Sequence, residues 1–380
     1  MTTLTLPSTR QEAWRWADPE AIAAAAKLPR ADVAVDVAGL FLDLPGARLV
    51  FRDGVLDAAA SRMDRVTLAE IAADDHPLGH FAGGAGWSLR LDKDGAADPV
   101  QIVHVASGGA NHVPGEIVLA EDAVAQVIET HVGIGWSNRF FRATLGRTAR
   151  LMRSVRLLQD GGFVSIRDVA TLDAGASLVS VFLGAGEAGS RIDAAVTQHG
   201  DGAFAEVGGA LLTAGTQKQE CAVVLRHAAL NGTSKQVWRA VAADKSAASL
   251  AARVEVARHA QKTDGEQSLR GLLLARTATV NLKPELEIFA DDVKCAHGAT
   301  VGELDARALF YLASRGIAPG RARAMLTRAF VADALARIGD ETVRAAFVAD
   351  ADSWLENSLS HWEREGARPA QPGGKGEGRV

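Results

Sequence analysis

The feature that most restricts the fold is the stretch 87–288, in which short apolar or alternating runs follow one another. Glycine, aspartate or asparagine bounds these runs, and no segment keeps a single apolar face over four helical turns. Runs of this kind are typical of β-strands. They include Ile102–Val105, Glu116–Leu119, Ala125–His131, Phe163–Val169, Leu178–Leu183, Ile192–Val196, Cys221–His227, Gln236–Val241 and Val254–His259.

This length of uninterrupted short strands is large for a β-sandwich or a barrel, which close on a limited number of strands. A β-solenoid can grow further, because each coil covers only its neighbours. Valine, leucine and alanine alternate with arginine, glutamine, aspartate and threonine, which suits stacked coils with a narrow interior. We therefore predict a mainly β protein with a parallel β-helix core.

Before this stretch, the sequence predicts a region of helices and short strands. Residues 1–30 carry apolar residues at helical spacing, and so does Thr67–Ala73. Residues 47–56 predict a hairpin, because two β-rich runs flank Asp53-Gly54, a dipeptide that favours a tight turn between strands.

After Gly302 the apolar period becomes that of α-helices. We expect helices over Asp305–Ser314, between Pro319 and Gly339, and over Glu341–Glu363. The glycine- and proline-rich end that follows is expected to be disordered. The predicted organisation is an N-terminal helical and mixed region (1–86), a parallel β-helix (87–298), a C-terminal helical domain (299–364) and a disordered tail (365–380).

Charge and composition argue against several classes of function. The formal net charge is −5 and the isoelectric point is near 6.1, whereas a protein that binds nucleic acid needs a basic surface to neutralise phosphates. No apolar run approaches the ~20 residues that span a bilayer, and the first residues lack the pattern of a secretory signal. Two cysteines 74 positions apart do not make a disulfide framework. We expect a cytoplasmic protein that binds neither nucleic acid nor membranes.

Two features of the stretch invite enzymatic interpretations. The segment Gly184–Gly189 has the glycine spacing of a dinucleotide-binding loop, but an alternating run follows it where that function requires a helix. We predict a turn between strands there instead. Paired carboxylates line the grooves of β-helix enzymes that cleave polysaccharides, and a polysaccharide-active enzyme is the alternative function. The residues available for that role are Asp173, Asp193, Asp201 and Glu206, for which turn and surface positions are an equally good explanation.

The strongest candidate site lies in Asn281–Asp305, where the β pattern gives way to the helical one. Cys295 and His297 come just after the alternating run, where glycine and threonine interrupt the strand pattern. On an extended chain, a thiol and an imidazole two positions apart point to the same side, which permits shared metal or sulfur chemistry. The other cysteine, Cys221, lies in the alternating run ECAVVLRH and is expected to be buried packing.

A long and nearly ungapped segment, Glu285–Ile317, resembles the C-terminal signature of the SufB/SufD family of iron–sulfur cluster assembly scaffolds. Its form C-x-H-G-A-T-V-G-x-L-D is that of the SufD branch, whereas SufB members usually carry C-E-H-E-A there. Gln261–Gln267, followed by Leu272–Leu274, resembles the family's Q-x-T-D-x-x-Q…LLL run, and LPSTRQEAWRWAD resembles the opening of the SufD branch. The match is dense over 250–338 and looser before it.

The resemblance implies a right-handed parallel β-helix between an N-terminal helical region and a C-terminal helical domain. It also implies a non-catalytic scaffold that pairs with a SufB-like paralogue through the ends of their β-helices and docks the ATPase SufC through its C-terminal helices. His297 and Cys295 would bind iron or a transient iron–sulfur cluster at the interface with SufB. The resemblance further implies reduced flavin on the whole complex, for which no site can be placed in the sequence. An open strand edge predicts a homodimer when the chain is alone.

Overall fold

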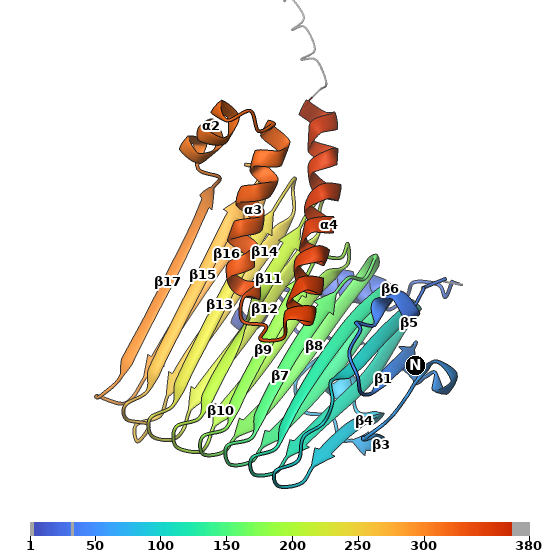
Figure 1. Ribbon diagram of the computed structural model, residues 1–380, viewed down its shortest axis with the longest axis vertical. Coiled ribbons are helices and arrows are strands. Elements are labelled where there is room, and N and C mark those ends of the chain that lie inside the picture. Colours follow the sequence, from blue (N-terminus) through green and yellow to red (C-terminus); the bar gives the residue numbers. More distant parts are fainter. Residues whose placement is uncertain (1–3, 32–33, 367–380) are drawn as a thin grey trace, which may run out of the picture.

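The core of the protein is a parallel β-solenoid, as the alternating runs predict (Figure 1). The computed structural model describes residues 4–31 and 34–366, with side chains as far as residue 358. Each coil contributes two strands, so a strand pairs in register with the strands two before and two after it. Ile192, for example, lies between Ile166 of the preceding coil and Cys221 of the following one.

The solenoid strands form two rows. The long β6 (Val124–Leu145) takes part in both rows, because its first half pairs with β7 and its second half with β8. After it, the first row consists of β8 (Gly161–Leu172), β10 (Gly189–Gln198), β12 (Lys218–His227), β14 (Ala247–Val256) and β16 (Thr279–Ile288). The second row consists of β7 (Arg150–Leu157), β9 (Ser177–Gly184), β11 (Phe204–Thr213), β13 (Thr233–Ala242), β15 (Asp264–Leu273) and β17 (Lys294–Glu303). Alternate valine, leucine, isoleucine and alanine side chains of both rows meet in one continuous buried core, because successive residues of a strand face opposite sides.

The first coils are built differently from the later ones. Their strands are β1 (Arg48–Arg52), β2 (Val55–Leu56), β3 (Val66–Ile71), β4 (Gly84–Leu91) and the long β5 (Val100–Leu119). β1 and β2 form the predicted hairpin, and Asp53 and Gly54 take positive φ values of 49° and 88° at its turn. The helix predicted over Thr67–Ala73 is wrong: β3 pairs antiparallel with β4, and this ladder gives the backbone its hydrogen bonds in place of a helix.

The same corner recurs in successive coils of the solenoid. The residue at the tip of each corner has the left-handed backbone conformation, with a positive φ. The backbone N–H of each tip residue donates to a carbonyl of the next coil, which ties neighbouring corners together. Aspartate, asparagine and glycine, which tolerate positive φ best, occupy most of these positions. The tips are Asp94, Asp122, Thr148, Gly175, Gly202, Asn231 and Lys262.

The N-terminal residues form a strap, defined here as residues 4–31, in which the helical pattern predicted over residues 1–30 gives only short helical segments; residues 1–3 lie outside the described residues. It contains a 3-10 turn (Glu12–Trp14) and the short α1 (Pro19–Ala25), which begins after Asp18, whose side chain accepts from the N–H of Ala21 at 3.0 Å. Trp14 and Ile22 bury their side chains against Trp136 and Phe163 of the first strand row. Three further 3-10 turns cover Ala38–Leu40, Ala58–Ala60 and Gly79–Phe81.

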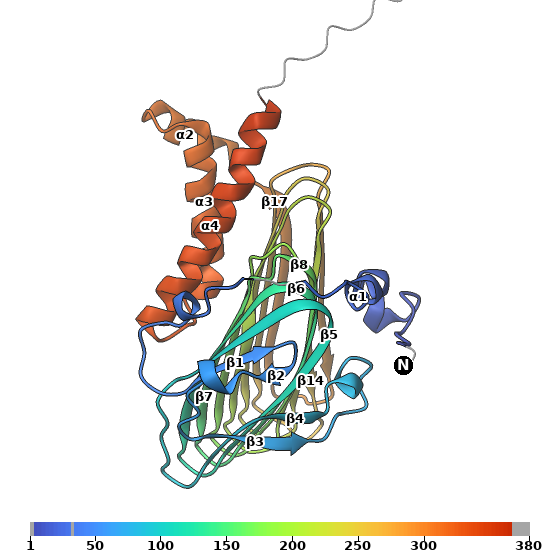
Figure 2. The ribbon, with the colours of Figure 1, turned by 90° about the vertical axis from the view of Figure 1, so that its right-hand side faces the viewer.

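Three C-terminal helices follow β17, as the change of period predicts: α2 (Ala306–Ser314), α3 (Pro319–Leu335) and α4 (Glu341–Gly366). The side chain of Asp305 caps α2, and Pro319 is the first residue of α3. α3 and α4 pack on the second strand row, and Figure 2 shows them on the side of the solenoid opposite α1. Their buried contact includes Leu183, Leu212, Val241, Val331, Leu335 and Phe347.

The expected disordered tail lies, from residue 367 on, outside the described residues, whereas residues 365 and 366 end α4. No helix within the described ranges combines the length and the apolar character that crossing a membrane would require.

Candidate site at the terminal coil

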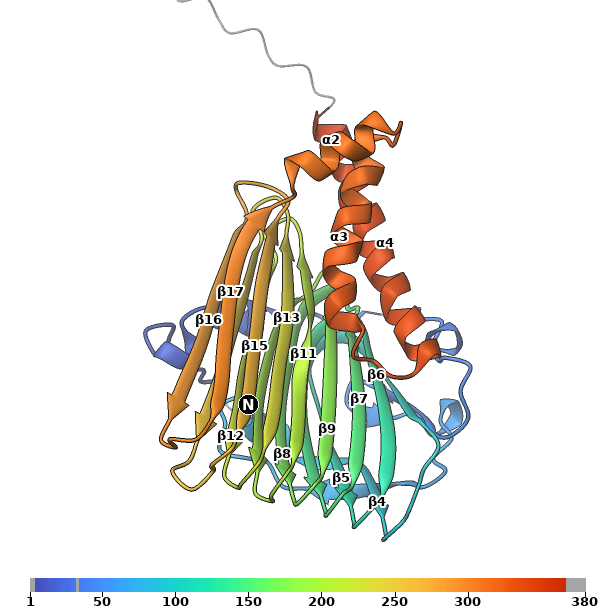
Figure 3. The ribbon, with the colours of Figure 1, turned by 60° about the vertical axis from the view of Figure 1, so that its left-hand side comes forward.

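The solenoid ends in an uncovered coil formed by β16 and β17. β16 pairs with β14 and β17 pairs with β15, and among the described residues no strand lies beyond them (Figure 3). Strands of the inner coils are paired on both sides, so their backbone N–H and C=O groups are used. In the terminal coil, half of the backbone hydrogen-bonding groups are left for a partner.

The terminal coil also differs from the inner coils in burial. Almost every residue of β11 and β13 is buried, whereas β17 is exposed over nearly its whole length. Large apolar side chains lie open here: Phe289 is 58% exposed and Val301 is 45% exposed. An unpaired strand edge with exposed apolar residues is the type of surface that another strand covers.

Cys295 lies inside β17, which continues past the point where glycine and threonine interrupt the strand pattern. Pairing with β15 places it opposite Gly265. The thiol is half-buried against Val254 and Ala290. Burial raises the pKa of the Cys295 thiol, so a ligand or sulfur carrier at this position must first lose its proton.

His297 is two residues further along β17 and exposed to solvent, opposite Gln267 of β15. The period of a strand puts it on the same face as Cys295. Cys221 is far from both in the solenoid interior, 1% exposed, as the prediction of buried packing requires. Among the described residues, no group of three metal-ligating side chains contains Cys295 or His297, so a four-coordinate metal centre here needs ligands from elsewhere.

The other motifs considered in the sequence have structural roles in turns, ion pairs and coil corners. Gly184–Gly189 connects the end of β9 to the start of β10, which confirms a turn between strands. The carboxylates considered for polysaccharide cleavage do not converge: Asp193 pairs with Arg191 under the strap, and Glu206 pairs with Arg337 on the opposite side. Asp173 and Asp201 accept backbone N–H groups at coil corners.

A second exposed surface lies on α2, which sequence reasoning did not single out. No residue of α2 is buried, and Phe310 and Tyr311 are 77% and 57% exposed. The run Leu309–Leu312, LFYL, was the available signal, since four consecutive apolar residues cover more than one face of a helix. α2 contacts α3 and projects away from the solenoid (Figure 1).

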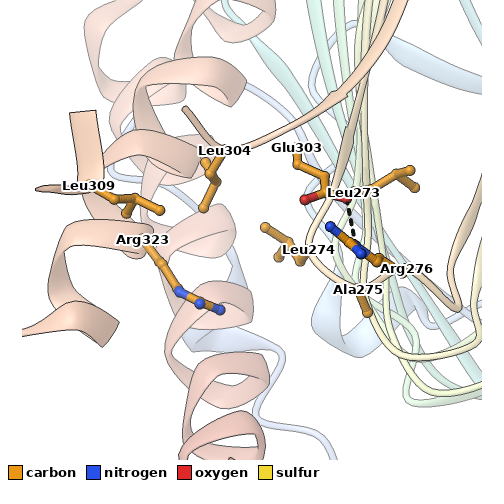
Figure 4. Close-up of a pocket in the computed structure, with 8 residues that line it drawn as sticks. All are labelled: Leu273, Leu274, Ala275, Arg276, Glu303, Leu304, Leu309 and Arg323. Carbon is orange, nitrogen blue, oxygen red and sulfur yellow. Dashed lines mark hydrogen bonds and ion pairs between the residues drawn. The ribbon is translucent and has the colours of Figure 1, made fainter. Parts of the chain in front are cut away.

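A pocket of about 240 Å³ separates α2 and α3 from the ends of the last strands. Figure 4 shows Leu274 and Leu304 on its walls and an ion pair between Arg276 and Glu303, with a distance of 3.1 Å. Because β17 continues into α2 through Leu304, this pocket lies at the joint between the terminal coil and the exposed helix.

Comparisons with known proteins agree on one family. The sequence model described as "SUF system FeS cluster assembly, SufBD core domain" matches residues 104–330. The iron–sulfur cluster assembly protein SufD of Escherichia coli K12 is 28% identical over 337 residues, which cover 82% of this chain and 79% of that protein.

Two further relatives match over shorter stretches. The SufBD family protein slr0076 of Synechocystis is 36% identical over 163 residues, 42% of this chain and 35% of that protein. Protein ABCI7, chloroplastic, of Arabidopsis thaliana is 39% identical over 123 residues, 32% of this chain and 26% of that protein. The chain therefore spans well under two thirds of the length of these two relatives.

Proposed function

The chain belongs to the SufBD family of the SUF system for iron–sulfur cluster assembly, and we propose that it acts there as a non-catalytic scaffold subunit in the cytoplasm. The observation that carries this proposal is the terminal coil, whose open strand edge and exposed apolar residues coincide with Cys295 and His297. A self-contained enzyme would have its chemical groups converge within one chain. Of the two cysteines, Cys221 is buried and Cys295 is partly exposed, and Cys295 lies on the unpaired strand edge.

In this proposal, the terminal coil pairs with the corresponding coil of a SufB-like subunit. Strand addition across the two ends would satisfy the open backbone groups of β16 and β17 and bury Phe289 and Val301. The similarity to a protein named SufD supports a paralogous partner of the same fold.

The iron–sulfur cluster is the cargo of this interface. Imidazole in its neutral form is a suitable iron ligand, a role that we assign to His297, and Cys295 supplies a second donor once its proton has left. Their partial ligand set is explained if the partner's edge contributes the remaining donors. The resemblance also implies reduced flavin on the assembled complex, to which we assign no residues of this chain.

The C-terminal helices provide the second contact of the scaffold. We assign the exposed α2 surface, with Phe310 and Tyr311, to an ATPase of the SufC type. Exposed aromatic residues on a projecting helix are typical of contact hot spots. β17 leads directly into α2, so a movement of the ATPase would reach the strand that carries Cys295 and His297.

The test is cluster assembly on the reconstituted complex of this chain with SufB-type and SufC-type partners. His297→Ala should leave the complex intact on gel filtration and lower the yield of cluster, measured by visible absorption and iron content, by about tenfold or more. The expected loss follows because the imidazole is an iron ligand in this proposal. His199→Ala is the matched control, since His199 is also exposed but lies at a corner in the middle of the solenoid. Normal cluster formation on an intact His297→Ala complex would remove His297 from the site.

A further inference from the structure

Two histidines and a glutamate converge inside the first coils of the solenoid, far from the terminal coil. His104 of β5 and Glu129 and His131 of β6 each offer one ligand atom, and these atoms lie within 4.8 Å of one another. All three side chains are buried, with exposed fractions of 0%, 3% and 0%. The register brings them together: His104 is opposite His131, and Glu129, two residues before His131, faces the same side.

Burial and neighbouring charges lower the pKa of each of the three groups. Burial, reinforced by the charge of Arg139, lowers the pKa of His104 to about 4. Burial also lowers the pKa of His131 well below its usual value. For Glu129, burial acts to raise the pKa, but the charge of Arg153 and the contact with His104 outweigh it and lower the pKa overall. The donor atoms that the fold brings together are imidazole nitrogens of His104 and His131 and a carboxylate oxygen of Glu129.

The imidazoles have unused hydrogen-bonding capacity. Within the part of the chain that the structure describes, neither nitrogen of His131 has a hydrogen-bond partner, nor does Nδ1 of His104, and leaving a buried polar atom without a partner is unfavourable. The two rings are stacked, with centroids 4.7 Å apart and planes 21° from parallel. One ring must turn out of the stack for a nitrogen of each to approach a shared ion at ~2.1 Å.

Two arginines beside the three side chains affect which metal ion they can bind. Arg153 holds Oε1 of Glu129 at 2.7 Å and Asp168 at 2.5 Å, which leaves Oε2 of Glu129 facing His104 at 3.2 Å. A carboxylate that binds a metal ion commonly accepts a hydrogen bond from a second group in the same manner. The positive charge of Arg139 nearby weakens the binding of any cation. An ion that binds here must therefore form strong bonds to the imidazole nitrogens. This disfavours Mg²⁺ and Ca²⁺, which prefer oxygen ligands.

We propose that His104, Glu129 and His131 bind one divalent transition-metal ion of the zinc or ferrous class. Two histidines and one carboxylate form a donor set that such ions use in proteins. The proposal is independent of the function assigned to the terminal coil, because the group lies at the opposite end of the solenoid and needs no partner subunit.

The experiment uses the full chain carrying Cys295→Ser and His297→Ala, so that the terminal coil cannot contribute. Produced in medium supplemented with cobalt and then dialysed, this chain should retain about one Co²⁺ and show the visible absorption of nitrogen- and oxygen-bound cobalt. Adding His131→Gln or Glu129→Gln should lower the cobalt content to about a tenth. His227→Gln is the matched control, because His227 is equally buried but already bonded to Ser234 at 2.8 Å. Elemental analysis of chain from unsupplemented medium distinguishes zinc from iron.

Absence of cobalt from the parent chain, or full retention by the His131→Gln variant, would overturn the proposal. If His131→Gln does not fold, the parent chain decides alone. Its melting temperature should rise by several degrees when it is produced with added zinc, since an ion that binds only the folded state stabilises it. An unchanged melting temperature would contradict the site.

Discussion

At the scale of single residues, Arg191 of β10 fastens the N-terminal strap to the solenoid. Its guanidinium pairs with Asp193 at 2.6 Å and with Glu220 at 2.7 Å. It also donates to the carbonyl of Ala13 at 2.8 Å and lies 4.2 Å from the ring centroid of Trp14. Burial acts to lower the pKa of Arg191, but the two carboxylates outweigh it and raise the pKa.

Replacing Arg191 with alanine should lower the free energy of unfolding by about 3–5 kcal/mol, because two buried carboxylates lose their countercharge. Arg226 offers a matched control, since its side chain is 57% exposed and pairs with Glu255. Arg226→Ala should cost about 0–1 kcal/mol. Urea unfolding of both variants measures the difference, and equal losses would mean that Arg191 does not hold the strap.

A buried histidine makes stability depend on pH. Burial lowers the pKa of His227 to about 4 from an ordinary value of 6.5, so the folded state binds fewer protons than the unfolded state between these values. The stability contributed by neutral His227 is fully present above pH 6.5 and is lost as the pH falls toward 4. Asp168 and Glu220, whose pKa values burial raises to about 6 and about 7, have the opposite effect.

His227→Gln keeps a nitrogen near the position of Nε2 but removes the titrating group. Between pH 6.5 and 4, unfolding free energies of the variant should fall less steeply than those of the parent, by at most about 1.4 kcal/mol per pH unit. Asp168 and Glu220 titrate in both proteins, so their effect cancels in the difference. Parallel pH profiles would show that the pKa of His227 is the same in the folded and the unfolded protein.

At the scale of elements, substitutions in α2 allow docking to be tested separately from stability. Phe310 and Tyr311 are exposed, so changing both to serine should leave the melting temperature within about a degree, since exposed positions contribute little to folding. Affinity for a SufC-type ATPase should fall at least about tenfold if these residues are its hot spot. Isothermal titration calorimetry measures the affinity, with Leu230→Ser, 43% exposed at a corner of the solenoid, as control. An unchanged affinity of the double variant would show that the docking surface does not lie on α2.

At the scale of the whole molecule, the stacked coils end in an edge that a second copy can cover. We expect the isolated chain to form a homodimer through the terminal coil, and gel filtration with light scattering should show it. Phe289→Lys together with Val301→Lys should give a monomer, because charge opposes the burial of this edge. Leu68→Lys, on exposed β3 at the other end of the solenoid, should leave the dimer unchanged. If Leu68→Lys alone breaks the dimer, the first coils and not the terminal coil form the contact.

Much of the fold could be predicted from local sequence patterns. Side-chain alternation in runs such as Ile192–Val196 identifies strands, because it depends only on the two-residue period of an extended chain. Asp53-Gly54, Asp305 and Pro319 mark a turn and two helix starts for equally local reasons. Thr67–Ala73 was mispredicted because its spacing also fits a helix, and only pairing with β4 decides between the two.

The coil repeat was present in the sequence but not recognised there. The left-handed corner residues recur 26 to 31 positions apart, and aspartate, asparagine or glycine at most of them is a detectable signal. Cys295 lies within the predicted β-helix (87–298), but the local pattern did not assign a separate strand to it. Glycine and threonine weaken the local pattern of β17, whereas its hydrogen bonds come from β15.

By itself, the sequence determined the mainly β core, the helical C-terminus and the segment that carries Cys295 and His297. Only the tertiary structure decided that these two residues lie on an uncovered edge, and that His104, Glu129 and His131 meet inside the coils. It likewise placed Arg191 beneath the strap. The reason is physical: alternation along a strand is a property of neighbouring residues, whereas the register between coils depends on pairing over some 30 positions, which no local pattern specifies.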